Sequence, residues 1–546
     1  MKKKTVSMIL AGTLAVSMLL SACQSNSGEQ TQQSGSDIPS DSEEVDIWKM
    51  PEKITVTSAK NVYDVNIYPA GQSPDKNDLY DAIEEVMNIK FENVFAVPND
   101  AYKQKIKMGI STGDLPDMFT ADEEDFAELV RNDALVDLAP YVERYGSDNL
   151  KHVLEYNEGA AMKPYLRGEK LYGIPNMSDA LNSVPVLWIR SDWLENLNME
   201  APKTKEELVD LAKAFAENDP DGNGQKDTYG LALSKDLDLR FTGFANLFQA
   251  YPKVYRIDDS GKFSYGSVEP EVKEVLAQLA DLYAAGAIDP EFATKDLNKM
   301  AEAVSQGKVG MYIGEFFTPL WPLVDTVNLI DGADWIGIPM PEDNFVPYAN
   351  INAMGAHVVR KGFEHPEAII IYLNNIVEAG YENQDNEWSN KYAELSVTYA
   401  NNGLNNWFPM LFDLPDANAT RLELFKQVDE TGDTSILPPN AKNTYDLIQA
   451  AKAGDKTQWA WPKTYYEGVE SALSYDELIY TDWYLPPTET AKRVGTSLTD
   501  LENTLFINII CGNEPVDAFD QFCEDWAAQG GTTILEEMEQ ESAANK

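Results

Sequence analysis

The chain has 546 residues, of which 43 are basic and 90 are acidic, and its formal net charge is −47. This charge argues against a nucleic-acid partner, because such proteins use Lys and Arg to neutralise phosphates. It also argues against a body that lies on anionic lipid headgroups, and it favours a soluble monomer that resists self-association. The length exceeds what one hydrophobic core serves, so we expect at least two lobes.

The first residues of the chain predict export. Lys2, Lys3 and Lys4 form a positively charged start, and residues 8–20 form an apolar run too short to span a bilayer comfortably. Small residues then lead to a cysteine in Leu20-Ser-Ala-Cys23. The pattern predicts a signal peptide over residues 1–22, cleaved directly before Cys23.

Leu20-Ser-Ala-Cys23 resembles the lipobox of bacterial lipoproteins, whose cysteine carries acyl chains such as palmitate. The resemblance implies that Cys23 anchors the protein to the extracellular face of the cell membrane, and a single lipid anchor suggests a Gram-positive cell. The alternative is an ordinary signal peptide with an incidental cysteine. Residues 23–49 are rich in Ser, Gln, Gly, Asp and Glu, so we expect a disordered, acylated tether there.

Hydrophobic periodicity predicts strands and helices that alternate along the chain. The predicted elements are, in chain order, a strand at 53–58, a helix at 78–88, a strand at 89–95, a helix at 101–110, a strand at 184–190, helices at 204–216 and 270–285, and a strand at 308–313. Thr204 and Glu207 form a capping box at the start of one of these helices. This alternation indicates an α/β fold with mainly parallel sheets.

Five short motifs follow one another along the chain. They are Ser111-Thr-Gly-Asp-Leu-Pro-Asp117, Lys170-Leu-Tyr-Gly-Ile-Pro175, Leu187-Trp-Ile-Arg-Ser-Asp-Trp193, Gly307-Lys-Val-Gly-Met311 and His365-Pro-Glu-Ala368. In this order, after the lipobox, they are similar to the extracellular solute-binding lipoproteins of ABC importers, in particular the oligosaccharide-binding group. The similarity runs from about residue 50 to residue 535.

The resemblance implies a two-lobed α/β fold of the type 2 periplasmic-binding-protein kind, with a ligand cleft between the lobes and three hinge crossings. The crossings would fall near residues 176–185, 347–352 and 403–412. Lobe one would comprise residues 50–180 plus 352–405, and lobe two residues 181–350 plus 410–546. General principles agree, since ligands favour crevices outside strand ends and lobes close around them by hinge motion.

One loop has the spacing of a calcium site. Its candidate ligands are Asp219, Asp221, Asn223, Gln225 and Asp227, which match the first nine positions of an EF-hand loop. Gly224 stands where the loop must turn, but Gly230 replaces the bidentate Glu of position 12. Alginate-binding members of the resembled family carry a structural calcium in a comparable loop. The sequence predicts a structural calcium site or, alternatively, a polar turn without an ion.

Oligosaccharide recognition needs aromatic faces and hydrogen-bonding side chains, and the chain has 11 Trp, 26 Tyr and 20 Phe. The resemblance places ligand near the crossings and after certain strands. The candidate ligand-binding residues are Trp188, Phe316, Phe317, Tyr348, Asn350, Asn352, Trp407, Trp461 and Asp117. A core position is the alternative for roughly half of the aromatic ones.

The predicted function is a lipid-anchored substrate-binding protein that captures an oligosaccharide and delivers it to the permease subunits of an ABC transporter. We expect no enzymatic activity and no catalytic cofactor. The length, linkage and charge of the sugar stay open, and a peptide ligand is an alternative.

Two other classes stay open, a surface-tethered glycoside hydrolase and a surface adhesin lipoprotein. Gly109-Ile-Ser111-Thr-Gly113 matches a nucleophile elbow, but a helix rather than a strand is predicted before the serine. Cys511 and Cys523 could form a disulfide in an oxidising compartment, and the sequence does not decide this.

Overall fold

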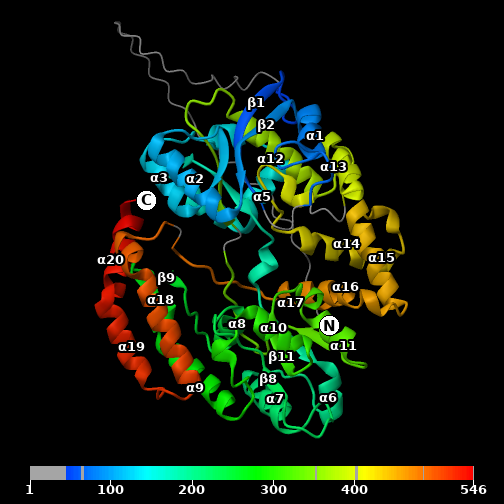
Figure 1. Cartoon of the computed structure of the whole chain (residues 1–546), viewed down its shortest axis with the longest axis vertical. Coiled ribbons are helices and arrows are strands. Elements are labelled where there is room, and N and C mark those ends of the chain that lie inside the picture. The colour runs from blue at the N-terminus through cyan, green and yellow to red at the C-terminus, as the bar shows by residue number, and fades with distance from the viewer. Residues whose placement is uncertain (1–44, 63–66, 351–352, 400–403, 484, 545–546) are drawn as a thin grey trace. The chain divides into compact units, whose positions relative to one another are not determined.

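The computed structural model describes residues 45–62, 67–350, 353–399, 404–483 and 485–544 (Figure 1). The predicted signal peptide, Cys23, most of the predicted tether and the ligand candidate Asn352 lie outside these residues. Within the described ranges, no helix has the length and apolar character needed to cross a membrane.

The first sheet has five strands in the spatial order β2-β1-β3-β13-β6. Their bounds are β1 Ile54–Asn61, β2 Ile89–Val97, β3 Met118–Ala121, β6 Ile174–Met177 and β13 Ala353–Val359. The helices of this part are α1 Asp78–Met87, α2 Asn99–Thr112, α3 Glu123–Arg131, α4 Ala139–Tyr145, α5 Asp148–Gly159, α12 Glu367–Gly380 and α13 Glu387–Thr398. A hairpin joins β4 Leu166–Arg167 to β5 Lys170–Leu171.

Helix α1 shows how local sequence sets these elements. The Asn77 side chain accepts a hydrogen bond from the Tyr80 backbone N–H at 3.1 Å and caps the helix start. Leu79, Ile83 and Val86 recur at helical spacing and are buried. The following residue, Asn88, adopts the left-handed conformation with φ 57° and ends the helix directly before β2.

The second sheet has four strands in the order β12-β7-β11-β8. Their bounds are β7 Val186–Arg190, β8 Tyr229–Leu231, β11 Val309–Gly314 and β12 Trp335–Ile338. The helices of this part are α6 Ser191–Leu197, α7 Lys205–Glu217, α8 Leu239–Asn246, α9 Pro270–Ala284, α10 Leu297–Ser305 and α11 Leu323–Leu329. Strands β9 Tyr255–Ile257 and β10 Phe263–Tyr265 form a separate hairpin.

The eight predicted strands and helices are confirmed, each within a few residues of its predicted bounds. The capping box at α7 forms in a modified way. The Thr204 hydroxyl accepts from the Glu207 backbone N–H at 3.2 Å as expected. The Glu207 carboxylate, however, accepts from the backbone N–H of Lys203 at 2.7 Å.

The prediction of mainly parallel sheets is wrong, because both sheets are mixed. Strand β1 runs parallel to β2 and β3, and β8 runs parallel to β11. Strand β13 is antiparallel to β3 and β6, and β7 is antiparallel to β11 and β12. Each of these antiparallel strands enters its sheet from a crossing. Parallel neighbours are joined by an α-helical crossover within one sheet, and β7 and β13 are not reached through such a crossover.

Separate hydrophobic cores support the two sheets. One core contains residues on both sides of β1, β3 and β13, including Val56, Phe119 and Val358. The second sheet is covered on both faces, because β7 sends Leu187 and Ile189 into one buried cluster and Trp188 into another. Separate buried clusters for the two sheets agree with the length argument for more than one lobe.

The C-terminal part of the chain is helical. Its elements are α14 Ala417–Thr431, α15 Pro439–Lys452, α16 Ala460–Pro462, α17 Glu470–Ala472, α18 Glu489–Ile510, α19 Ala518–Trp526 and α20 Thr532–Ala544. Phe506 and Phe522 of this part are buried in the same cluster as Leu187, whereas Phe425 joins the cluster of Trp188. Cys511 and Cys523 are free thiols.

Three segments connect the parts built on the two sheets. The first lies between β6 and β7, the second between β12 and β13, and the third follows α13 through η6 Leu404–Trp407. The first and third segments bond to each other, because Asp413 N–H donates to Met177 O at 3.2 Å and Ala180 N–H donates to Pro415 O at 2.8 Å. The lobe boundaries given above stay predictions.

Candidate binding site

A cavity of about 720 Å³ lies at the carboxyl ends of β1 and β3. We call it the first-sheet cavity. These two strands are parallel, so the residues that follow them share one edge of the sheet, where ligands of α/β proteins bind. The residues that line it include Lys60, Asn61, Asn99, Tyr102, Lys103, Asp122, Glu123, Asp125, Asn176 and Phe408.

Side chains of the first sheet and of α12 hold one wall of this cavity, which is formed by residues 406–411, here called the strap. The buried Lys60 ammonium donates to the carbonyls of Asn406 (2.7 Å) and Phe408. Tyr372 donates to Met410 O at 2.7 Å. Counting His357 below, four side-chain contacts therefore hold the carbonyls of residues 406, 408, 410 and 411 of the strap.

His357 makes the last of these contacts. Its Nε2 lies 2.7 Å from Leu411 O, and since a carbonyl only accepts, Nε2 carries the proton. Its Nδ1 then accepts from the Thr120 hydroxyl at 2.9 Å. Burial lowers the pKa of His357 to about 4, so His357 is neutral at pH 7. Burial also lowers the pKa of Lys60, to about 7.

A second cavity of about 390 Å³ lies at the carboxyl ends of the parallel strands β8 and β11. We call it the second-sheet cavity. The residues that line it include Asn182, Ser183, Asp236, Leu237, Asp238, Thr242, Lys253, Glu315, Tyr348 and Asn350. Burial raises the pKa of Tyr348, whose hydroxyl therefore stays protonated at pH 7.

Arg240 lies beneath the second-sheet cavity and holds two of its carboxylates. Its side chain is 4% exposed, with Nη2 3.1 Å from Glu315 Oε2 and Nη1 3.4 Å from Asp238 Oδ2. The guanidinium also donates to the Tyr312 hydroxyl from Nη2 at 2.7 Å. One buried cation thus orients two carboxylates without facing the cavity itself.

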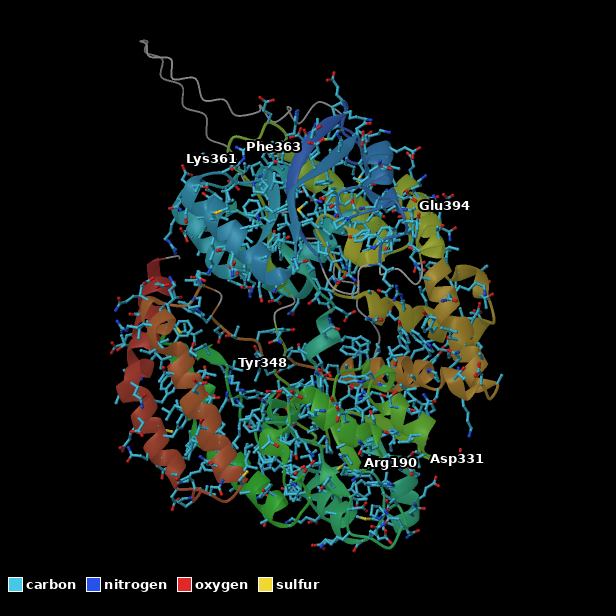
Figure 2. All side chains as sticks on the ribbon, in the orientation of Figure 1. Arg190, Asp331, Tyr348, Lys361, Phe363 and Glu394 are labelled. Atoms are coloured by element: carbon cyan, nitrogen blue, oxygen red, sulfur yellow. The ribbon has the colours of Figure 1, made fainter. Side chains whose placement is uncertain are left out.

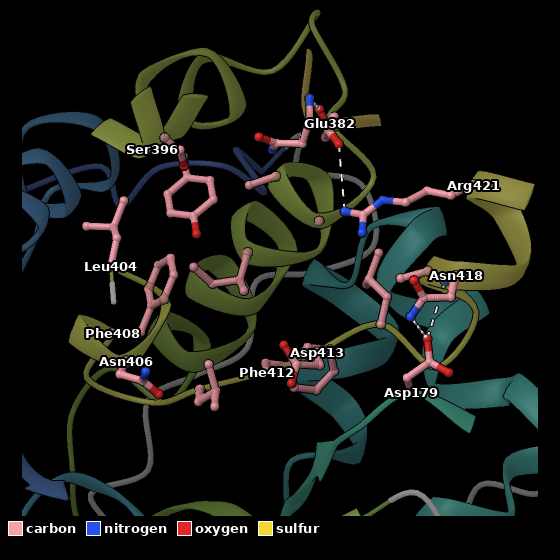
Figure 3. Close-up of a pocket in the computed structure, with 18 of the residues that line it drawn as sticks. Asp179, Glu382, Ser396, Leu404, Asn406, Phe408, Phe412, Asp413, Asn418 and Arg421 are labelled. Carbon is pink, nitrogen blue, oxygen red and sulfur yellow. Dashed lines mark hydrogen bonds and ion pairs between the residues drawn. The ribbon is translucent and has the colours of Figure 1, made fainter. Parts of the chain in front are cut away.

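A third cavity, of about 710 Å³, lies where α12, α13 and α14 meet the first and third connecting segments (Figure 3). We call it the hinge cavity. Figure 3 shows Asp179 bonded to Asn418, at 2.9 Å, and Arg421 beside Glu382, at 3.9 Å. Burial raises the pKa of Asp179, Glu382 and Asp413.

Tyr348 and Asn350 are the predicted ligand residues that the structure places in a cavity. Tyr348, labelled in Figure 2, has its backbone N–H fixed by Asn246 Oδ1 at 3.0 Å. The Asn350 backbone N–H donates to the Ser183 hydroxyl at 2.8 Å and its side chain is exposed. Both therefore lie on the second connecting segment with side chains available to the second-sheet cavity.

Trp188 and Trp407 lie in hydrophobic cores and are fully buried. The Trp188 indole donates to Glu315 O at 3.2 Å, so it supports the second-sheet cavity from behind. Trp407 stacks on Tyr68 with ring centroids 4.9 Å apart. Protein covers both indoles, which leaves no ring face for a sugar in this structure.

The other aromatic candidates lie outside the three cavities described above. Phe316 is buried, whereas Phe317 is 38% exposed and meets the Phe316 ring edge to face. Trp461 is partly buried at the edge of the Trp188 cluster. Of these three, Phe317 alone keeps a large part of its ring accessible.

Asp117 lies at the amino end of β3, opposite the edge that carries the first-sheet cavity. Its Oδ1 pairs with Arg360 Nη2 at 2.6 Å, and its Oδ2 accepts from the Thr57 hydroxyl at 2.6 Å. Asp117 therefore connects neighbouring strands of the sheet and lines none of the three cavities.

The predicted calcium loop brings several oxygen-bearing side chains together. The Asn223 amide donates to Asp221 Oδ2 at 2.8 Å and to Asp227 Oδ1 at 3.1 Å. Asp219 Oδ1 is buried without a hydrogen-bond partner. Burial, with further contributions from Asp219 and Asp227, raises the pKa of Asp221. The donors have calcium chemistry, although no cluster of three acidic, His or Cys side chains in the described chain has metal-binding geometry.

Sequence reasoning missed the carboxylates of both sheet cavities. Asp122 follows β3, Asp236 and Asp238 follow β8, and Glu315 follows β11. The signal was present, because polar residues directly after parallel strands mark the ligand edge of a sheet. The sequence-based assignment depended on aromatic residues instead. Of the aromatic residues that line these cavities, Tyr102 and Phe408 are at most 7% exposed, whereas Tyr348 is partly exposed.

The structure does not support a nucleophile elbow at Ser111. Helix α2 continues to Thr112, so Ser111 lies in its last turn and not between a strand and a helix. Its hydroxyl donates to Lys107 O at 2.9 Å.

Two α/β parts with separate cores, three connecting segments and a polar cavity at the carboxyl edge of each sheet define a two-lobed binding protein. The model of the bacterial extracellular solute-binding protein family matches residues 75–369, and the chain belongs to that family. The predicted family and two-lobed fold are thereby confirmed.

The chain is also similar to individual proteins. It is 25% identical to the polygalacturonan/rhamnogalacturonan-binding protein YtcQ of Bacillus subtilis (strain 168) over 485 residues, 86% of this chain and 89% of that protein.

Two solved structures have the same fold. One is the HMO-binding, ABC-transporter-associated solute-binding protein of Bifidobacterium longum infantis, with 15% identity over 89% of this chain and 98% of that one and a TM-score of 0.59. The other is the alginate-binding protein AlgQ2 without calcium ion, with 15% identity over 90% of this chain and 99% of that one and a TM-score of 0.56.

Proposed function

We propose that this protein captures an oligosaccharide and delivers it to the permease subunits of an ABC importer. The observation that carries the proposal is the pair of polar cavities at the carboxyl edges of the two sheets. Both contain carboxylates and amides, which accept from or donate to sugar hydroxyls, and the second adds the partly exposed ring of Tyr348, which can pack on a sugar ring. The names of YtcQ and of the Bifidobacterium protein, which specify carbohydrates, support this ligand class.

The proposed mechanism is closure around the ligand. A sugar that contacts Asn61 and Glu123 of one cavity and Asp236 and Tyr348 of the other binds the closed state more tightly than the open one. Its differential affinity for the closed state then shifts the population toward closure. The protein binds and releases the sugar without cleaving it.

Tyr348→Ala tests the site. The expected result is at least a tenfold loss of oligosaccharide affinity in titration calorimetry, because the aromatic face is lost while the backbone N–H that bonds Asn246 remains. Phe317→Ala measures the separate contribution of the exposed aromatic from the sequence-based assignment. Unchanged affinity in both variants would contradict this placement, and release of shorter sugars by the wild-type protein would favour the glycoside hydrolase.

We also propose that the protein is a lipid-anchored monomer on the extracellular face of a Gram-positive membrane. Leu20-Ser-Ala-Cys23 supports the anchor, because a thiol directly after the cleavage position is where acyl chains attach. Cys23→Ser should move most of the protein from the membrane fraction to the medium, because no other lipid attachment is proposed. Cys511→Ser serves as the matched control and should stay with the membrane; release of both variants, or of neither, would contradict the assignment.

The loop over residues 219–227 is proposed to hold a structural calcium ion. Asp219, Asp221, Asn223 and Asp227 would supply side-chain oxygens and Gln225 a backbone carbonyl, as in the first nine positions of an EF-hand. The unpartnered, buried Asp219 Oδ1 supports this, because a cation would satisfy it. A bound ion would fix the connection between α7 and β8.

Calcium is expected to stabilise the chelator-treated protein by about 2.7 kcal/mol at a free concentration of 100 Kd. Thermal unfolding with and without calcium measures this gain. Asp221→Asn should lose most of it, whereas Asp259→Asn, exposed on the β9–β10 hairpin, should keep it. An equal gain in both variants would contradict the site.

A further inference from the structure

Carboxylates outnumber cations in each of the three cavities. The first-sheet cavity has Asp122, Glu123 and Asp125 against Lys60 and Lys103; the second-sheet cavity has Asp236, Asp238 and Glu315 against Lys253; and the hinge cavity has Asp179, Glu382 and Asp413 against Arg421. The sequence left the charge of the ligand open, because a local group of Arg or Lys would have overridden the acidic character of the whole chain. The described cavities contain no such group.

Most of these cations are already bound to protein acceptors. The Lys60 ammonium donates to two carbonyls of the strap, and the Lys253 ammonium donates to Leu237 O at 3.1 Å. Arg421 lies beside Glu382. Lys103 remains exposed on α2 and is the one lining cation for which the described structure gives no partner.

Arg240 offsets part of the negative charge of the second-sheet cavity from behind, and with Arg240 counted the cavity still has three carboxylates against two cations. It contacts Glu315 and Asp238 from the buried side, so the carboxylates and not the guanidinium line the cavity. The cavity surface therefore offers carboxylate acceptors beside the hydroxyl and amide groups of Ser183, Thr242 and Asn350. A ligand complements it by bringing donors, which sugar hydroxyl groups are.

A uronic acid would need the opposite arrangement. Proteins bind carboxylates with Arg or Lys, in the case of Arg through two parallel hydrogen bonds. A sugar carboxylate placed beside Asp122 and Glu123 in the first-sheet cavity, or beside Asp236 in the second-sheet cavity, would meet like charges in a partly desolvated space. Two such groups within a few ångströms repel strongly enough to change affinity by an order of magnitude or more.

We infer that this receptor selects neutral oligosaccharides and rejects uronate-containing ones. The inference rests on the proposed function and names the substrate class of the same site. It sets this chain apart from its relative YtcQ, whose name specifies a polymer of an acidic sugar. Because all three cavities share the charge pattern, the inference holds whichever of them contributes most of the contacts.

The test is titration calorimetry with the mature protein and a panel of oligosaccharides in pairs, each uronate-containing member with a neutral counterpart of the same linkage and length. An α-1,4-linked galactotriose and trigalacturonate form one such pair. The neutral member of any binding pair should bind at least tenfold more tightly at low salt. The affinity of the acidic member should rise as sodium chloride increases, since salt screens the repulsion, while that of the neutral member stays constant.

Charge-removing variants separate this cause from shape. Asp236→Asn and Glu315→Gln should each reduce the difference in affinity between the neutral and the acidic member of a pair. Asp331→Asn is the control and should leave this difference unchanged, because Asp331 is exposed between α11 and β12 and lines none of the three cavities (Figure 2). Equal or tighter binding of the acidic member, or an unchanged difference in both cavity variants, would overturn the inference and leave the proposed function intact. Binding of no sugar at all would instead contradict the proposed function, and the inference with it.

Discussion

Gly230→Ala is expected to lower the free energy of unfolding by about 3 kcal/mol or more. A Cβ atom at this position would lie 2.0 Å from Ala212 O and 2.5 Å from the carbonyl carbon and Cα of Ala212. These are backbone atoms of α7, which packs on β8, so relief requires moving a helix against a strand. Chemical denaturation of the variant and the wild type measures the loss.

Gly495→Ala is the matched control for this prediction. Gly495 lies inside α18 with open space where its Cβ would be, so the same substitution should stabilise the protein by about 0.5–1 kcal/mol through helix propensity. A Gly230→Ala variant as stable as the wild type would contradict the close approach of α7 to β8.

The tight contact at Gly230 also explains the departure from the EF-hand pattern. Gly230 holds the twelfth position, and a glutamate there would bring a Cβ into the backbone of Ala212. Fold packing thus excludes the usual bidentate ligand from this position, and the proposed calcium site has to take its remaining ligands from elsewhere.

Arg240→Ala is expected to cost about 3 kcal/mol of folding stability and to weaken sugar binding. Removal of the buried cation leaves Asp238 and Glu315 without their partner, and an uncompensated pair of carboxylates is costly. The Asp238 side chain also caps α8 by accepting from the Arg240 backbone N–H at 3.1 Å, so its displacement disturbs the second-sheet cavity. Denaturant unfolding and titration calorimetry measure the two effects.

Two further variants show whether the buried charge is responsible. Arg240→Lys keeps the charge and should recover part of the stability. Arg256→Ala makes the same truncation at an exposed arginine and should change stability by less than about 1 kcal/mol. Equal losses in Arg240→Ala and Arg256→Ala would show that the carboxylates do not depend on Arg240.

The sequence predicted the elements of the fold well because their periodicity is strong. The helix over residues 78–88 and the strand at 89–95 lie within one or two residues of α1 and β2, where Asn77 and Asn88 fix the helix ends. The direction of β7 and β13 could not be read in the same way. Strand direction depends on where a connecting segment returns to a sheet, and no local pattern records this.

The binding site was harder to predict, because stacking aromatics and core aromatics look alike in a sequence. Trp188 alternates with Leu187 and Ile189 on a strand that is covered on both faces, so alternation does not mark it as exposed. The carboxylates after β3, β8 and β11 were predictable from strand ends, whereas the inward use of Lys60 and Arg240 depends on contacts with residues far along the chain.

The strap has a consequence for how this receptor can bend. Lys60, Tyr372 and His357 hold its carbonyls as far as Leu411, and directly beyond it the third connecting segment bonds to the first through Asp413 and Met177. The first and third connecting segments are therefore bonded to each other and should move together. Asn418 also bonds to Asp179, so we expect flexing to begin only past Asn418 and Ala180, where this pairing ends.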